Sequence, residues 1–540
     1  MIGIKKLKNN LNILNMKQNY TLIIFLGLML SGFFAQSQTR YIDDVFTSYT
    51  TKDTVYSTNI SILRAPQGII EPIDLAMKIY TPEGDDHTDR PIILVAHTGN
   101  FLPQYINGGI GGGMSDSVVV NTCKRLTAKG YVAAAFTYRQ GWNPIAPDQD
   151  TRTGTLLQAA YRGIQDARTA VRFIRKSVAE EGNPYGVDPE KIGIWGIGTG
   201  GYVSLGAATL DDYEEVTLDK FLNSETLLPL ADTVLLGNFY GTNQTQLNLP
   251  NHVGYSSDFA LCVNVGGAMG DISWLDGKEN EPAFIGYHAT GDVFAPFADG
   301  PVIVPTTMQF VVNVSGTKTV IDSANAKGNN DVFASLLPEF DPLKDQVEAQ
   351  KAKTINWSAE YSTEAGADNM YAFQTPVPIG SPWNWWDKPT LDAIIPQVNF
   401  VLGTDYSSDT LHLSGLLTNP NMSAELGNTY LDTMFLHFAP RACLALNLGC
   451  QVSGVQDLKP LEIGLKAFPN PVLTETTLQV NADESIQKVY LYNTEGKLVQ
   501  AVTNINSNIY NLKRNDLPSG SYFARIFVEE GAVVKQLLFE

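Results

Sequence analysis

The segment GIWGIGTGGY, residues 193–202, marks a change from one kind of local structure to another. The apolar run KIGIWGI (191–197) is typical of a buried strand, and TGGYVSLGAATL (199–210) predicts a helix that begins at a glycine-rich turn. A strand that leads through a tight turn into a helix is the repeating unit of parallel sheets with helices on their faces. We therefore expect residues 193–202 to lie at the carboxyl end of a central strand, where such sheets form ligand sites.

The same alternation continues on both sides of this segment, from residue 40 to about residue 330. Apolar, β-branched runs predict strands at DLAMKIYTP (74–82), PIILVAH (91–97), YVAAAFTYR (131–139), FALCVNVGG (259–267), PAFIGYHA (282–289) and MQFVVNV (308–314). Helical spacing of apolar residues predicts helices over residues 115–130 and 154–181. The expected fold class is α/β, with a mostly parallel sheet covered by helices on both faces. Residues 340–450 are less regular.

The end of the chain has a different pattern. Apolar and polar residues alternate there in short runs separated by Asn, Gly, Asp and Pro, which predicts a small all-β sandwich. The clearest runs are TTLQVNA (476–482), QKVYLYN (487–493) and SYFARIFV (521–528). The polar stretch 451–464 contains Gly and Pro and is typical of a linker. We therefore expect a body over residues 38–450, a linker over 451–464 and a β-sandwich domain over 465–540.

Residues 1–37 have the features of a targeting signal. Lys17 precedes an apolar run from Leu22 to Phe34, and the small-residue site Ala35-Gln36-Ser37 follows it. The run is too short to span a bilayer comfortably. We predict a signal peptide that starts at Met16, an upstream extension over residues 1–15, and no transmembrane segment in the mature protein.

Charge and cysteine usage exclude several classes of partner and cofactor. Acidic residues outnumber basic ones, 56 to 37, and no Lys/Arg run interrupts this excess, so nucleic acid and anionic membranes are poor partners. Cys443 and Cys450 close a small loop and are able to pair, whereas Cys123 and Cys262 are expected to be buried thiols. No CxxC or HExxH motif occurs, so no metal and no cofactor is predicted.

The tail resembles the C-terminal sorting domain, type A, of the bacterial type IX secretion pathway. The resemblance rests on FPNP (468–471), VYLYNTEGKLV (489–499), LPSGSYFARI (517–526) and KQLLFE (535–540). It implies a Gram-negative, Bacteroidetes-type host and the type IX secretion machinery as partner. It also implies delivery to the cell surface or the medium.

The body, over roughly residues 40–450, resembles the α/β-hydrolase fold, nearest to carboxylesterases and feruloyl-esterase-like lipases. PIILVAHTGNF (91–101) resembles the family's strand and oxyanion loop, the opening segment resembles the G-x-S-x-G nucleophile elbow, and AFIGYHATGDVFAPF (283–297) resembles the segment with the catalytic acid. The resemblance implies Asp292 as that acid. It implies the Thr199 N–H, with the N–H of Gly99 or Asn100, as oxyanion donors, although Asn100 and Thr98 stand where the family has glycine.

The nucleophile and the base do not fit the family's pattern. The elbow apex is Gly198, which has no side chain, and Thr199 and Ser204 belong to the helix that follows. The family's histidine lies in a loop after the strand that follows the acid, but no histidine occurs between His288 and His412. His437, in an expected helix, is the remaining candidate base. A glycine at the apex relieves the strain that a side chain suffers in an elbow.

Two functions remain open at this point. One is a secreted or surface-bound hydrolase-fold protein without serine-esterase activity, which binds a small molecule, a glycan or a protein. The other is an active carboxylic ester hydrolase that uses an unrecognised nucleophile or a water molecule activated by Asp292. Two further features bear on the ligand: a tryptophan group that is either a stacking platform or core, and the glycine-rich segment 107–116, expected at the pocket rim. The tryptophans are Trp383, Trp385 and Trp386.

Overall fold

The computed structural model describes residues 40–540, apart from 108, 305–307, 357–361, 451–459, 461–462, 483, 495–497, 516 and 529–530. The predicted signal peptide and most of the predicted linker therefore lie outside the described residues. Among the described residues, no helix combines the length and the apolar character that a membrane span requires.

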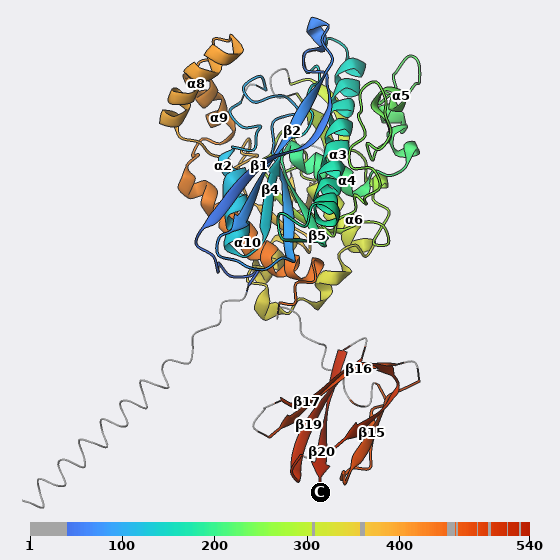
Figure 1. The fold of residues 1–540 in the computed structure, drawn as a ribbon. Helices are drawn as coiled ribbons and strands as arrows, with labels where there is room; N and C mark the ends of the chain where they lie inside the picture. Colours follow the sequence, from blue (N-terminus) through green and yellow to red (C-terminus); the bar gives the residue numbers. More distant parts are fainter. Residues whose placement is uncertain are drawn as a thin grey trace, which may run out of the picture.

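A β-sheet forms the centre of the body, with helices around it (Figure 1). It has eight strands in the order β1-β2-β4-β3-β5-β6-β8-β13. Its strands are β1 (Tyr49–Ser61), β2 (Glu71–Pro82), β3 (Arg90–Ala96), β4 (Val132–Phe136), β5 (Val187–Ile197), β6 (Leu261–Val265), β8 (Ala283–Ala289) and β13 (Met370–Phe373). Strand β2 is antiparallel to both of its neighbours, and all pairs from β4 to β13 are parallel. The expected mostly parallel sheet is confirmed.

Helices cover both faces of this sheet, as predicted. Strand β3 shows why, because its alternate residues point into two separate cores. Ile92 and Leu94 pack with residues of α3 (Gln149–Glu180), α4 (Thr199–Thr209) and α6 (Thr317–Ala326). Ile93 and Val95 pack with residues of α2 (Ser117–Ala128) and α10 (Ala424–Ala445). A strand that is buried on both faces has a continuous apolar run, and the segment PIILVAH (91–97) is such a run.

The edge strand β1 was not predicted from the sequence, and two further strands differ from the expectation. The segment 308–314 does form a strand, β10 (Phe310–Gly316), but it pairs with β9 (Asp299–Ile303) and β7 (Ala268–Met269) in a small antiparallel sheet instead of joining the main one. The eighth strand of the main sheet is β13, which comes from the region expected to be less regular. These two strands matter because they carry loops and walls of the site described below.

The remaining elements of the body are short or lie at its periphery. They are α5 (Thr233–Leu236), α7 (Lys344–Lys351), α8 (Lys388–Leu402), α9 (Ser408–Thr418), β11 (Thr354–Asn356) and β12 (Ser362–Glu364). Of the three neighbouring tryptophans, Trp383 and Trp385 are buried in the core with α10. They pack there and do not form an exposed stacking platform. Cys123 and Cys262 are buried free thiols, as predicted. Cys443 and Cys450, whose pairing the sequence left open, form a disulfide.

The C-terminal region is all-β, as predicted. Its strands are β14 (Lys466–Phe468), β15 (Glu475–Gln479), β16 (Ile486–Asn493), β17 (Leu498–Ser507), β18 (Ile509–Lys513), β19 (Gly520–Val528) and β20 (Gly531–Phe539). They form one sheet of order β14-β15-β18 and another of order β17-β16-β19-β20. Its core holds residues such as Leu478, Leu491 and Ile526, and its members all lie between residues 463 and 539.

Candidate functional site

The turn at Gly198 has the backbone conformation that the elbow pattern predicts. Gly198 joins the end of β5 to the start of α4 with φ 56° and ψ −117°. Its N–H donates to the Val265 carbonyl at 2.8 Å, and its carbonyl accepts from the Gly201 N–H at 2.8 Å. A residue with a Cβ pays a steric cost at this positive φ, and glycine does not.

The glycines on either side hold this turn close to the sheet. A Cβ on Gly196 would lie 2.1 Å from the Gly200 carbonyl oxygen, and one on Gly200 would lie 2.3 Å from that of Ala96. Both contacts are with backbone, which has little room to move. Helix α4 therefore begins directly against β3 and β5 only because these positions are glycine.

The space beside Gly198 is filled from the neighbouring loop. A Cβ on Gly198 would lie 2.2 Å from Thr98 Oγ1 and 2.9 Å from Thr98 Cβ. Thr98 is the second residue after β3. It follows His97, whose Nδ1 lies 2.6 Å from the Thr98 carbonyl oxygen. Tyr138 stacks on the His97 ring and places its hydroxyl 3.1 Å from Thr199 Oγ1. The Thr98 side chain is thus located where the side chain of an elbow nucleophile begins.

The oxyanion loop brings one of its two candidate donors to the site. Gly99, Asn100 and Phe101 have successive positive φ values of 128°, 55° and 53°. The Trp142 indole N–H donates to the Asn100 carbonyl at 2.6 Å and so fixes the orientation of that peptide. Asn100 and Thr199 line a common cavity, whereas Gly99 is not among its lining residues. Within the described part of the chain, neither the Asn100 N–H nor the Thr199 N–H has a hydrogen-bond acceptor.

Asp292 lies in the same cavity, in the loop after β8. Its Oδ1 accepts from the N–H groups of Phe294 and Ala295 at 2.8 and 3.2 Å. Its Oδ2 is 3.8 Å from His288 Nε2, and the side chain is only 6% exposed. Burial raises the pKa of Asp292 to about 6, and the two backbone hydrogen bonds only partly offset this. The carboxyl group is therefore held in place and is easily protonated.

The loop after β13 passes directly over this carboxyl group. A Cβ on Gly380 would lie 2.6 Å from Asp292 Cγ, and Ser381 lines the cavity. This is the loop in which the resemblance places a catalytic histidine, and positions 380 and 381 carry glycine and serine. Neither the space-filling role of Thr98 nor the place of Ser381 was predicted from the sequence. The departure of Thr98 from the family's glycine was the only signal for either of them.

The structure does not bring His437 to Gly198 and Asp292. His437 is buried on α10, where its Nδ1 lies 3.2 Å from the Tyr287 hydroxyl. Burial lowers its pKa well below the ordinary value, with a further contribution from Arg441. Its ring packs in the core on the α10 side of the sheet, and it does not line the cavity. His288 is also buried, and it contacts Thr317 Oγ1 and the Ala295 carbonyl.

The cavity has a volume of about 160 Å³ and a lining of two kinds. Its polar and backbone lining comes from Thr98, Asn100, Gly198, Thr199, Asp292 and Ser381. Its apolar lining comes from side chains of α3, such as Leu156 and Ile164, from Trp274, and from Val302 and Val312 of the small antiparallel sheet. Within the described residues no histidine, cysteine or lysine lines it. Such a lining can hold a ligand that carries both apolar and polar groups.

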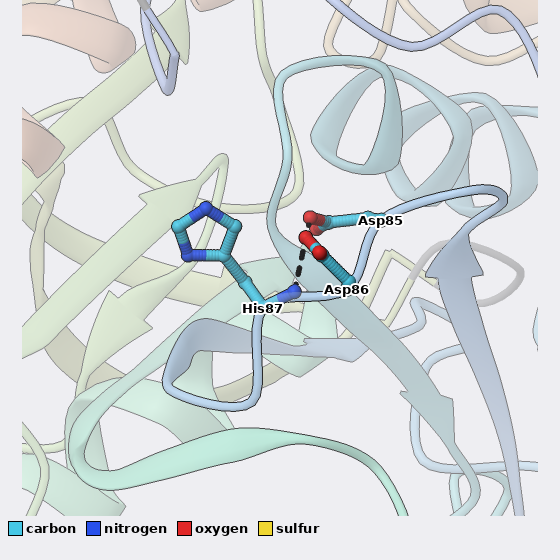
Figure 2. Close-up of side chains that lie close together, drawn as sticks. All are labelled: Asp85, Asp86 and His87. Atoms are coloured by element: carbon cyan, nitrogen blue, oxygen red, sulfur yellow. Dashed lines mark hydrogen bonds between the residues drawn. The ribbon is translucent and has the colours of Figure 1, made fainter.

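A second group of side chains has the spacing of metal ligands. Among the described residues, Asp85, Asp86 and His87 place one ligand atom each within 4.8 Å of one another (Figure 2). Asp85 is already bound by the Arg40 guanidinium at 2.5 Å and lies 3.5 Å from Arg90 Nη1. Burial raises the pKa of Asp85, but the hydrogen bonds from Arg40 and the His87 N–H outweigh it and hold the pKa below its ordinary value. We assign no ion to this group.

Comparisons with known proteins find similarity in both parts of the chain. Residues 77–228 match the BD-FAE family, and residues 466–540 match the secretion system C-terminal sorting domain. The first match includes Gly198 but ends before Asp292.

Solved structures similar to the chain include esterase 2 of Thermogutta terrifontis phosphorylated by paraoxon, which is 18% identical with a TM-score of 0.28 over 46% of this chain and 73% of that one. The propionate-bound form of the same esterase is 18% identical with a TM-score of 0.26, over 46% and 74% of the two chains. No curated protein matches. The chain thus combines an esterase-like α/β-hydrolase domain with a secretion-system C-terminal sorting domain.

Proposed function

We propose that this protein is delivered to the cell surface or the medium and uses its esterase-like cavity to bind a ligand without serine-esterase catalysis. The observation that carries the proposal is the contact between positions 98 and 198. A side chain at position 198 would begin 2.2 Å from Thr98 Oγ1. The elbow therefore has no side chain of its own, and a side chain placed there would have to displace Thr98.

The other parts of the site support this proposal. Ester hydrolysis by a serine mechanism needs a nucleophile, a base that takes its proton, an acid that orients the base, and donors for the oxyanion. The cavity offers the last two through Asp292 and the N–H groups of Asn100 and Thr199. His288 lies 3.8 Å from Asp292 but does not line the cavity, and among the described residues no other histidine does; Gly380 and Ser381 lie beside Asp292 in the loop after β13. Binding of a ligand needs no nucleophile and no base, so Asp292 and the two N–H groups are sufficient for it.

One observation favours a second function. Thr98 Oγ1 occupies the position from which an elbow side chain would act, and it lines the cavity together with Asp292. An ester hydrolase with Thr98 as nucleophile is therefore the alternative. Its weakness is that a hydroxyl without a neighbouring base is a poor nucleophile at neutral pH.

Hydrolysis of p-nitrophenyl acetate and butyrate by the purified mature chain separates the two functions. The proposal expects rates no higher than those of the heat-denatured protein. A rate well above that control, lost in Thr98→Ala but retained in Thr429→Ala at an exposed position of α10, would establish the alternative instead.

The sorting domain supports a secreted or cell-surface location. We propose that the type IX secretion machinery carries the protein across the outer membrane of a Bacteroidetes-type host, after a signal peptide in residues 1–37 has directed it across the inner membrane. Fractionation of host cells that express the chain with and without residues 465–540 tests this. The truncated form should remain in the periplasm, and its appearance at full level outside the cell would contradict the proposal.

A further inference from the structure

Helices α8 and α9 pack against each other at the edge of the body, where they are drawn in orange (Figure 1). Both expose large apolar side chains. Phe400 and Val401 of α8 are 90% and 77% exposed, and Leu413 and Leu417 of α9 are 62% and 73% exposed. Single exposed apolar residues are ordinary, but a group of them on two neighbouring helices is typical of an interaction surface. We call these four residues the exposed apolar group.

The two helices pack against the body through their other sides. Residues of both are buried in one small cluster with Ile110 of the glycine-rich segment, namely Leu391, Ile395 and Leu411. Phe400 is nine residues, or about two and a half helical turns, after Leu391 and so lies on the opposite side of α8. The exposed leucines of α9 are two and six residues after Leu411 and also lie away from it. Each helix is thus apolar on two sides, a pattern typical of helices that are covered on both.

The charges on the two helices indicate what covers the exposed apolar group. Residues 393–404 and 410–424 contain no Asp, Glu, Lys or Arg. The only Lys or Arg between residues 387 and 424 is Lys388, and it is paired with Asp392 and Asp409. Attraction to an anionic membrane needs unpaired cations at the contact. A second copy of the chain is repelled by the net charge of −19 on each molecule. A lipid surface without net charge meets neither objection.

We propose that α8 and α9 insert the exposed apolar group into the surface of a bilayer of zwitterionic lipids. The four side chains enter the boundary between the headgroups and the acyl chains, and Lys388 with its two acidic partners stays in the aqueous headgroup region. Helices that bind in this way enter the boundary by about 5–10 Å, and their affinity increases with the apolar area that they bury. This interaction does not depend on the ligand of the cavity.

The lipid-binding surface lies next to a loop that lines the cavity. The ring of Tyr406, between α8 and α9, has its centroid 6.2 Å from that of Tyr105. Tyr105 and Ile110 follow Asn100 and Phe101, which line the cavity. Membrane binding through α8 and α9 would therefore hold this loop close to the lipid surface.

Co-sedimentation of the mature full-length chain with phosphatidylcholine vesicles, at physiological ionic strength, tests the proposal. The native chain should bind the vesicles. Phe400→Ser should lower the partition coefficient at least about tenfold, because it removes the largest apolar side chain of the group. Leu417→Ser should lower it about threefold or more. Val234→Ser is the matched control, since Val234 is 81% exposed on α5, and it should leave the partition coefficient unchanged.

Three further measurements make the result unambiguous. All three variants should keep the native unfolding temperature, since they change exposed side chains. Phosphatidylglycerol added to the vesicles should not strengthen binding, and a partition coefficient that rises with the anionic lipid would overturn the proposal. Sedimentation equilibrium without lipid should show a monomer, whereas a dimer that Phe400→Ser dissociates would establish a second copy as the occupant instead. Absence of binding to phosphatidylcholine, or equal losses in Phe400→Ser and Val234→Ser, would also overturn the proposal.

Discussion

The turn around Gly198 and the loop around Asp292 differ in the kind of group that they present to the cavity. The turn presents backbone, because Gly198 has no side chain and Thr98 lies in the space beside it. The loop presents a side chain, the Asp292 carboxylate, which two backbone N–H groups hold in place. His288 lies 3.8 Å from that carboxylate but does not line the cavity, and Gly380 and Ser381 of the loop after β13 lie beside it. Backbone and side chain thus make separate contributions to one cavity.

The packing explains the difference. The elbow backbone is fixed by contacts that the fold itself needs, since α4 starts against β3 and β5 through Gly196 and Gly200. The packing of α4 against β3 and β5 does not require a side chain at position 198. Asp292, by contrast, bonds its own loop and so has a structural role without catalysis. Three substitutions in the site and one deletion outside it test this difference. Their expected effects on stability decrease from the substitution of Gly200 to the deletion of the tail.

The largest effect is expected at Gly200. In Gly200→Ala the Cβ would meet the carbonyl oxygens of Ala96 and His97 at 2.3 and 2.8 Å, which only a shift of backbone in the central sheet can relieve. We expect a loss of at least about 3 kcal/mol in the free energy of unfolding, measured by urea denaturation. Gly154→Ala on α3 is the matched control. Its Cβ meets only the flexible Leu230 side chain, at 3.3 Å, so it should cost less than about 1 kcal/mol.

The second prediction concerns Asp292 and pH. The folded protein raises the pKa of this group from 3.8 to about 6, so between these values the folded state binds more protons than the unfolded state. The contribution of Asp292 to stability therefore falls as the pH rises through this window and stays low above it. Two pKa units correspond to about 2–3 kcal/mol.

Asp292→Asn isolates that contribution, because it removes the titration and keeps an acceptor for Phe294 and Ala295. The stability of the variant relative to the native chain should improve by about 2 kcal/mol between pH 4 and pH 7. A difference that is flat over this range would show that Asp292 ionises at little cost, and that burial does not raise its pKa.

The third prediction concerns the contact between Gly198 and Thr98. Gly198→Ser should destabilise the protein by about 2 kcal/mol, from strain at a positive φ and from the contact with Thr98. It should not produce efficient ester hydrolysis, since no histidine lines the cavity among the described residues. Thr98→Ala should recover about 1 kcal/mol of the loss in a double-mutant cycle. Strict additivity would mean that Thr98 does not fill the elbow space.

The smallest effect is expected from removal of the tail. Among the described residues, the core of the C-terminal region draws only on positions 463 to 539, and the two cores of the body contain none of these. Deletion of residues 465–540 should therefore shift the unfolding temperature of the body by less than about 2 °C in calorimetry. A larger shift would mean that the tail stabilises the body as well as directing its export.

Much of the fold was accessible from the sequence, because strand and helix periodicity is local. Strands β2 to β6, strand β8 and the long helix α3 follow from it. Strand β1 was not predicted, because it is an edge strand with few apolar residues. Strand β13 was missed because it has only four residues and is defined by its pairing with β8. The partner of β10 was missed for the same reason, since pairing joins distant segments and leaves no periodic mark.

The parts of the site that sequence motifs define were predictable. The parts that depend on the conformation of a loop were not. The places of Gly198, Thr199, Asn100 and Asp292 in one cavity were anticipated from motifs in the chain. The candidate base His437 was inferred by elimination, and its helix packs on the other side of the sheet. The role of Thr98 depends on a loop with three successive positive φ values, which no sequence pattern specifies.

The central claim is that the elbow has kept its backbone and lost its nucleophile. Intact mass spectrometry of the purified mature chain, after incubation with an excess of a fluorophosphonate probe, tests this most directly. We predict an unchanged mass at every time point, beside an active serine esterase that is labelled to completion. An adduct of one probe per chain that is mapped to the cavity would contradict the claim, and its location on Thr98 would identify that residue as the nucleophile.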